Sequence, residues 1–319
     1  MRITVLSGGV GGARFLRGLR DWSAGEHQLT AVVNTGDDMW LTGLRVCPDL
    51  DSITYTLAGV SDEQRGWGRV GETERVSAEL AAFGVGWPWF TLGDLDLGTH
   101  IARSHHLRSG LSLSEATRLI TSRWELGVEL LPVTDDEVET HVVTADGELH
   151  FEEWWTRLRA SVPATAFVQR GVSASTPALG VLEAIGEADL VILAPSNPVV
   201  SVGTVLGIPG VRAAVGATSA SVVGVSPIIG GAVVRGMADV CLTAIGVETS
   251  AEAVAAHYGS RSTGGLLDGW LVDETDAAAL PAIGALGINS RAVPLWMRDA
   301  ATSSQLAADT VTLGLQARA

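Results

Sequence analysis

MRITVLSGGVGGAR, residues 1–14, has the pattern of a buried strand that passes through a glycine loop into a helix. Residues 2–6 are mostly apolar and β-branched, as in a strand of a parallel sheet. Phe15, Leu16 and Leu19 then recur at helical spacing. In this arrangement the backbone N–H groups that open the helix meet an anion, usually a phosphate, and glycine permits its close approach. We therefore expect phosphate contacts from Gly8, Gly9, Gly11, Gly12 and Arg14; the alternative, a plain turn, rarely needs four glycines.

Two well-known phosphate loops do not match this stretch. A Walker A loop needs a lysine after its last glycine, and all 21 basic residues of this chain are arginine. In the dinucleotide-binding fingerprint the third glycine falls on Arg14. That fold also uses an acidic residue after its second strand to bind a ribose, whereas residues 29–33 end here in Asn34. The sequence therefore disfavours NAD and still predicts a nucleotide.

The composition is that of a globular protein with an acidic balance. Of 319 residues, 46% are hydrophobic and 18% are charged, which provides for a large core. The net charge of −15 argues against a nucleic-acid partner, so a phosphate ligand needs positive charge supplied locally by Arg14 and a divalent cation. The first apolar run ends at Leu6 and no apolar run reaches bilayer length, so we expect a cytoplasmic protein without membrane contact. Cys47 and Cys241 are expected to be buried free thiols.

Four aspartates lie within fifteen residues after the second predicted strand. Each one alone would be an ordinary helix-capping or first-turn residue. Together, after a phosphate loop, they suit Mg²⁺, which binds through one or two carboxylates and the phosphates of a substrate. The predicted metal ligands are Asp37, Asp38, Asp49 and Asp51, with Asp49 the strongest among them and also the expected catalytic residue.

The remainder of the chain alternates strands with helices, which implies an α/β fold with a doubly wound, mostly parallel sheet. We expect one domain over 1–319, in which about 60–160 forms an inserted, largely helical cap. Within that cap, 88–92 is predicted to be a strand, followed by Asp94 and Asp96 at its carboxyl end. Later strands end in polar turns suited to a phosphate, and the predicted contacts there are Ser196, Asn197 and Arg235.

Seven segments in collinear order make the chain similar to a known family. They are GGVGGAR (8–14), NTGDD (34–38), CPDLDSITYTL (47–57), LGDLDL (92–97), LLPVTDD (130–136), APSNPVVSVG (194–203) and SPIIGG (226–231). Each segment alone is weak evidence, whereas the seven together span nearly the whole chain. They resemble the 2-phospho-L-lactate transferase family, CofD, called FbiA in actinobacteria.

The resemblance implies a Rossmann-like core and a step in the biosynthesis of coenzyme F-420. Family members transfer a phospholactyl or phosphoenolpyruvyl group from a guanosine-diphosphate-activated donor to the ribityl hydroxyl of the deazaflavin Fo (7,8-didemethyl-8-hydroxy-5-deazariboflavin). GMP leaves, Mg²⁺ is required, and a homodimer is expected. On this basis Asn34 and Thr91 join the predicted nucleotide contacts, Asp49 accepts a hydrogen bond from the attacking hydroxyl, and the deazaflavin ring is expected to face Met39, Trp40 or Trp67.

One departure and two alternatives accompany the resemblance. The family usually has a basic residue at position 95, where this chain has Leu95, which puts the roles of Asp94 and Asp96 in doubt. A non-catalytic, nucleotide-sugar-binding regulator of the YvcK type shares the glycine loop, and a dinucleotide-dependent dehydrogenase is opposed by Arg14. The sequence does not distinguish a lactate from an enolpyruvate donor; the high arginine, alanine and glycine content without lysine favours an actinobacterial source and enolpyruvate.

Overall fold

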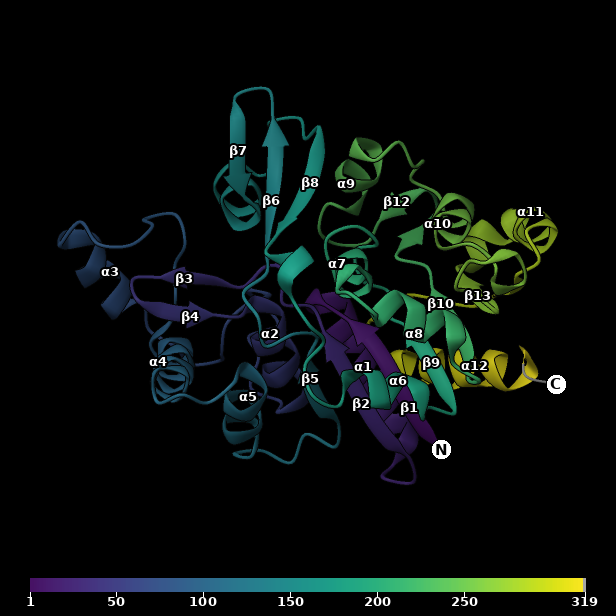
Figure 1. Ribbon diagram of the computed structural model, residues 1–319, viewed down its shortest axis with the longest axis horizontal. Coiled ribbons are helices and arrows are strands. Elements are labelled where there is room, and N and C mark those ends of the chain that lie inside the picture. Colours follow the sequence, from purple (N-terminus) through teal and green to yellow (C-terminus); the bar gives the residue numbers. More distant parts are fainter. Residues whose placement is uncertain (318–319) are drawn as a thin grey trace.

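The computed structural model describes residues 1–317 and is built around a seven-stranded sheet in which all neighbouring strands are parallel (Figure 1). The strand order is β14-β13-β10-β9-β1-β2-β5. Chain order therefore runs one way from β1 through β2 to β5, and the other way from β9 to β14. The reversal lies between β1 and β9, which is where ligands bind in open sheets of this kind. The strands are β1 (Arg2–Ser7), β2 (Gln28–Val33), β5 (Glu129–Pro132), β9 (Leu190–Leu193), β10 (Ser221–Val225), β13 (Gly269–Val272) and β14 (Asn289–Ala292).

Helices cover both faces of this sheet, and each face has its own apolar cluster. On one face the apolar cluster includes Phe15 of α1, Leu50 of α2 and Leu306 of α12. On the other face Ile185, Val205 and Val254 belong to α6, α7 and α10. Burial of these apolar faces explains why the central strands lack polar–apolar alternation. The helices are α1 (Gly9–Ser23), α2 (Pro48–Leu57), α5 (Leu113–Thr121), α6 (Val181–Gly186), α7 (Val202–Gly207), α8 (Val211–Ala217), α9 (Ala238–Ala244), α10 (Ala251–Tyr258), α11 (Leu280–Ala285) and α12 (Ala300–Ala317).

Two extensions leave the sheet, and they differ from the single helical insertion expected over 60–160. The hairpin β3 (Met39–Leu41) and β4 (Leu44–Val46) packs with α4 (Asp94–Arg108) to one side, and α3 (Arg75–Ala82) contacts α4. A separate antiparallel sheet consists of β6 (Glu139–Thr144), β7 (Gly147–His150) and β8 (Ala166–Arg170). Between the two extensions β5 pairs with β2 in the main sheet, so the region is not one continuous insertion. Short paired segments, β11 (Ile228–Ile229) and β12 (Ala232–Val233), follow β10.

One strand predicted from the sequence is not a strand in the structure. Residues 88–92 form a turn and coil, because Pro88 has no N–H to donate and Leu92 is held by Ser77, with which it exchanges two hydrogen bonds. In the separate sheet, β8 pairs with β6 and has no partner in the main sheet among residues 1–317. Among residues 1–317, no helix combines the length and apolar character needed to cross a bilayer.

Candidate active site

A cavity of about 1170 Å³ opens at the carboxyl ends of β1 and β9. Its floor is the loop that follows β1 and the first turn of α1, together with the turn after β9. Its walls come from α2 and α4, from the 66–68 and 89–92 loops, from the 151–159 segment, and from the segments 226–238 and 295–298. This position is the one that the reversal of strand order predicts for a ligand.

The glycines of the first loop allow close packing at the cavity floor. Gly9 has a φ of +63° and faces Asp49, so it is the one glycine of this loop that needs a left-handed backbone. A Cβ on Gly11 would lie 2.5 Å from the carbonyl oxygen of Pro195, and one on Gly12 would lie 2.0 Å from Ser7 Oγ. Gly8, Gly9 and Gly11 line the cavity, whereas Gly12 lets α1 pack closely against the side chains of Ser7 and Ser196.

Helix α1 begins at this floor without a side-chain cap and without an acidic residue in its first turn. Its opening N–H groups therefore provide a positive end to the helix dipole, directed at the cavity. Asp49 accepts a hydrogen bond from the Gly9 N–H and uses part of this capacity. The remaining groups suit a phosphate, and Arg14 lines the cavity one helical turn further on.

Ser196 and Asn197, the predicted phosphate contacts, line the cavity, but most of their polar atoms already have hydrogen-bond partners. Ser196 Oγ accepts from the Gly8 N–H at 3.2 Å and donates to the Gly8 carbonyl at 2.6 Å. Asn197 Oδ1 accepts from the backbone N–H groups of Val199 and Val200. Both side chains thus fix the glycine loop and the start of the following helix, and only the amide nitrogen of Asn197, 3.4 Å from the Cys241 sulfur, has a weak partner.

Asn34 is buried and does not line the cavity, but it organises two of the predicted metal ligands. Its Nδ2 donates to Asp37 Oδ2 at 3.2 Å and to Asp49 Oδ2 at 2.9 Å. Its Oδ1 accepts from the Gly36 N–H, which fixes the orientation of the amide. Asp37 and Asp49 therefore converge on one amide at the cavity floor. Asp37 Oδ1 is buried and has no hydrogen-bond partner among the described residues.

The other two predicted metal ligands are paired with arginine. Arg45 Nη2 lies 3.6 Å from Asp38 Oδ2, and Asp38 does not line the cavity. The guanidinium of Arg103 makes two hydrogen bonds to the Asp51 carboxylate, both side chains being buried. Of the four aspartates, the structure thus brings together Asp37 and Asp49, which have no basic partner among residues 1–317.

Burial governs the electrostatics of the acids at the floor. It raises the pKa of Asp49 to about 6, against the lowering effect of hydrogen bonds from Asn34 and Gly9. It raises the pKa of Asp37 well above the usual range, and the charge of Asp49 raises it further. Glu152, a third buried acid in the cavity wall, has its pKa raised to about 7 by burial and by the charge of Asp49. A cation at this place would lower all three pKa values.

A second acidic cluster lies in the wall between α2 and α4. Asp51, Asp96 and His100 present ligand atoms within 4.8 Å of one another, the one trio of possible metal ligands that close among residues 1–317. Arg103 already neutralises Asp51, and Tyr55 Oη donates to Asp96 Oδ1 at 2.7 Å. His100 lies 3.5 Å from Asp51 and 3.3 Å from Asp96, so this cluster is a network of polar contacts that joins the two helices.

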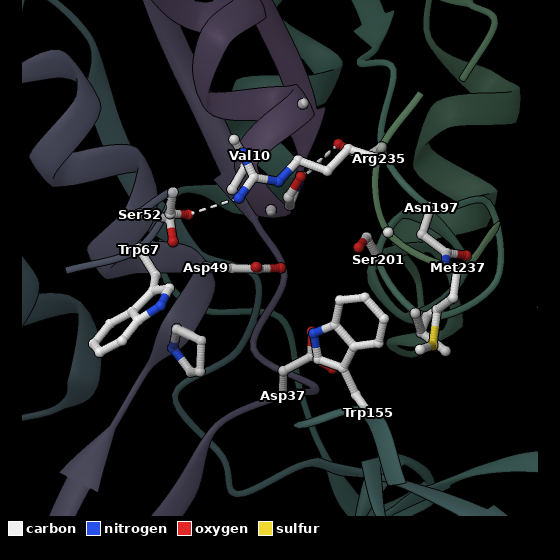
Figure 2. Close-up of a pocket in the computed structure, with 18 of the residues that line it drawn as sticks. Val10, Asp37, Asp49, Ser52, Trp67, Trp155, Asn197, Ser201, Arg235 and Met237 are labelled. Carbon is white, nitrogen blue, oxygen red and sulfur yellow. Dashed lines mark hydrogen bonds between the residues drawn. The ribbon is translucent and has the colours of Figure 1, made fainter. Parts of the chain in front are cut away.

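Four arginines that line the cavity form no ion pair with a carboxylate of the described residues. Arg14, Arg159, Arg235 and Arg298 all line it, and within residues 1–317 none of them forms an ion pair with a carboxylate. Arg235 extends across the mouth and donates from Nη2 to the Gly66 carbonyl at 3.1 Å (Figure 2). In a chain with a net charge of −15, four unpaired guanidinium groups around one cavity suit a ligand with several negative charges.

Aromatic side chains form much of the remaining wall, and most of them were not predicted. Trp67 lines the cavity as expected, whereas Met39 is buried in a separate apolar cluster and Trp40 donates from Nε1 to Glu137. In Figure 2 the carboxylate of Asp49 lies near the middle of the view, with the indole of Trp67 on one side and that of Trp155 on the other. Flat, apolar walls around a polar floor suit a ligand with aromatic rings. The other aromatic residues that line the cavity are Tyr55, Trp89, Phe90, Phe151 and Trp296.

The position that departs from the family pattern lies outside the cavity lining. Leu95 is 41% exposed and does not line the cavity. Asp94 is the first residue of α4, and its carboxylate accepts hydrogen bonds from the N–H and hydroxyl of Thr73. Asp96 and Thr91 do line the cavity. Of the two acids that flank Leu95, Asp96 is therefore the one that reaches the cavity.

Comparison with known proteins agrees with this architecture. The family model described as 2-phospho-L-lactate transferase CofD matches residues 3–283. The chain is 55% identical to the phosphoenolpyruvate transferase of Streptomyces coelicolor over 322 residues, covering 100% of this chain and 99% of the relative. It is also 55% identical to the phosphoenolpyruvate transferase of Thermobifida fusca, covering 99% and 98%.

Solved structures show the same fold at much lower identity. A UPF0052 family protein of Bacillus halodurans superposes with a TM-score of 0.65 at 16% identity, covering 97% of this chain and 98% of that one. A second crystal structure of a Bacillus halodurans protein gives a TM-score of 0.64 at 18% identity, covering 97% and 99%. These two likenesses bear on the fold, whereas the family model and the relatives at 55% identity cover the functional segments as well. This chain therefore belongs to the CofD family of 2-phospho-L-lactate transferases.

Proposed function

We propose that this protein transfers a phosphoenolpyruvyl group, or a 2-phospho-L-lactyl group, from a guanosine-diphosphate-activated donor to the ribityl hydroxyl of the deazaflavin Fo. In this reaction the hydroxyl oxygen forms a bond to the phosphorus that carries the three-carbon acid. The bond from that phosphorus to the bridging oxygen breaks, GMP leaves with that oxygen and its electron pair, and the proton of the attacking hydroxyl is released. Enolpyruvate is the preferred donor group because the relatives at 55% identity are named phosphoenolpyruvate transferases.

One observation carries the proposal: the phosphate loop, the unpaired arginines and the unpaired carboxylates all line one cavity. The α1 N-terminus and Arg14 suit the diphosphate. Arg159, Arg235 and Arg298 are further cations for the phosphates or the carboxylate of the donor. Phosphoryl transfer of this kind depends on positioning and charge neutralisation more than on covalent catalysis.

The acids at the cavity floor fit a Mg²⁺ ion. Asp37 and Asp49 are hard oxygen donors held together by Asn34, the buried Asp37 Oδ1 lacks a partner, and no basic residue neutralises either acid within residues 1–317. When bound, Mg²⁺ would neutralise charge on the phosphates during transfer. Asp49 is also the expected acceptor of a hydrogen bond from the attacking hydroxyl. The aromatic wall provides stacking surfaces for the deazaflavin and guanine rings.

The experiment is a mass-spectrometric assay of purified protein with Mg²⁺, Fo and each of the two guanosine-diphosphate donors in turn. The expected result is one coupled product with an equal amount of GMP, formed faster from the enolpyruvyl donor. Bound nucleotide without product from either donor would contradict the proposal and favour a nucleotide-sugar-binding regulator. Tight NADH binding would instead favour a dehydrogenase.

A further inference from the structure

Glu152 is a buried acid of the cavity wall that the sequence did not single out. It is 7% exposed and lines the cavity together with Asp37 and Asp49. Its carboxylate accepts a hydrogen bond from a neutral group, the hydroxyl of Thr156, at 3.1 Å. Within residues 1–317 no arginine or histidine forms an ion pair with it. A charge in this position is costly unless a proton or a cation compensates it.

The local fold holds Glu152 inward and its neighbour outward. The carboxyl lies just after β7, where the chain enters a π-helical turn, Glu153–Arg157. Trp154 is fully buried and donates from Nε1 to the Val162 carbonyl at 2.7 Å, which anchors the turn. Glu153 instead forms a partly exposed ion pair with Arg157 at 2.5 Å. Turns of this kind are frequent at functional sites, and here the turn begins directly after Glu152, whose carboxyl group lines the cavity.

The charge on Glu152 acts on the two acids that converge at Asn34. Its negative charge is among the groups that disfavour ionisation of Asp37, and the charge of Asp49 acts on Glu152 in the same sense. Three buried carboxyl groups thus repel one another in one cavity without a basic partner among the described residues. The buried Asp37 Oδ1, which has no hydrogen-bond partner, is an independent sign that this cluster is built for a ligand.

The distances limit the role that Glu152 can have. The only trio of possible metal ligands within 4.8 Å in the described part of the chain is Asp51, Asp96 and His100, so Glu152 does not share one coordination sphere with both Asp37 and Asp49. A carboxylate outside the first shell of an ion acts through its charge and through hydrogen bonds to ligands or to bound water.

We propose that Glu152 is a positioning residue for the divalent cation: its carboxylate adds the third negative charge around the ion at Asp37 and Asp49 and accepts a hydrogen bond from water on that ion. This inference rests on the proposed function, because it assumes that a divalent cation binds at these two aspartates. The assignment connects the three-stranded sheet, which carries Glu152, to the site on the main sheet.

The test is a titration of the metal-free full-length chain with Mn²⁺, followed by electron paramagnetic resonance, for the wild type and three variants. Glu152→Gln removes the charge and keeps the shape, and we expect it to weaken Mn²⁺ binding about 10-fold. Glu152→Asp keeps the charge and should recover part of that loss. Glu153→Gln, the matched control one residue away, should bind Mn²⁺ as the wild type does.

Thermal unfolding of the same metal-free proteins at pH 8 supplies a second readout. Glu152→Gln should raise the unfolding temperature because it removes repulsion, whereas Glu153→Gln should not. The inference would be overturned if Glu152→Gln bound Mn²⁺ within twofold of the wild type. It would also be overturned if this variant had a lowered unfolding temperature and an unchanged Mn²⁺ affinity. Either result would leave the proposed Mg²⁺ dependence of the reaction in place. A wild type that binds no Mn²⁺ would overturn both.

Discussion

Four aspartates lie between residues 37 and 51, and the structure divides them into two environments. Asp38 and Asp51 are buried beside Arg45 and Arg103. Asp37 and Asp49 are equally buried, but they share the amide of Asn34 and have no basic partner within residues 1–317. The first pair stabilises the contact between the β3–β4 hairpin, α2 and α4, and the second pair is the one that we propose binds the cation. The presence of a counterion, rather than burial or sequence position, separates the two pairs.

The largest expected effect concerns the paired acids. Asp51→Asn would leave the guanidinium of Arg103, which is 2% exposed, without its partner. We expect a loss of about 3–5 kcal/mol in the free energy of unfolding. Chemical denaturation measures it, and a loss below about 1 kcal/mol would show that the ion pair does not hold α2 and α4 together.

The unpaired acids should behave in the opposite way. Asp49→Asn should lower the rate of transfer by about 10²-fold or more, since it removes a carboxylate from the proposed cation. Stability should not fall, because the amide relieves repulsion with Asp37. Steady-state kinetics and denaturation of the same sample test both parts. Activity close to that of the wild type would remove Asp49 from the reaction.

The pH dependence of stability should also separate the two environments. Because burial raises the pKa of Asp49 to about 6 and that of Glu152 to about 7, the folded state holds protons that the unfolded state releases at lower pH. Stability of the metal-free protein should therefore fall as the pH rises from about 4 to 7. Mg²⁺ should restore stability more at pH 8 than at pH 5, by about 1 kcal/mol or more. Calorimetry with and without Mg²⁺ tests this; an equal effect at both pH values would argue against binding at these acids.

The smallest expected effect concerns the mouth of the cavity. Arg235→Gln removes a cation that now rests on the neutral carbonyl of Gly66. We expect the KM for the donor to rise about 10-fold, with kcat changed less, because a charged hydrogen bond contributes about 1.5–3 kcal/mol. Arg212→Gln, in a groove remote from the cavity, is the matched control. Equal kinetics for both variants would exclude a donor contact from Arg235.

The sequence predicted much of this arrangement because its signals are local. The strand, glycine loop and helix at residues 1–23 depend on apolar spacing and on glycines that tolerate close contact, and both appear in the structure. The acids at the start of α2 were likewise recognisable, since Asp49 and Asp51 occupy its first turn. Sequence spacing could not show which of them meets an arginine, because Arg103 is 52 residues away from Asp51.

The residues that were missed depend on tertiary placement. Glu152, Trp155 and Arg159 reach the cavity from the segment that joins β7 to β8 in the separate three-stranded sheet. A signal was present, since FEEWWTR (151–157) combines two tryptophans and two acids directly after a hairpin. The wrongly predicted strand at 88–92 shows the reverse error: aromatic residues favour strands, but here Trp87 and Trp89 stack on each other in a loop.

The most direct test of the account is to locate the divalent cation. Mn²⁺ titration followed by electron paramagnetic resonance should find a site that is lost in Asp49→Asn and retained in His100→Gln, which leaves the Asp51–Arg103 pair intact. That result would place the ion with the unpaired acids at the end of β1, where the phosphate loop and the arginines also converge. Retention of the ion in Asp49→Asn and its loss in His100→Gln would place it instead at Asp51, Asp96 and His100, and would contradict the central claim.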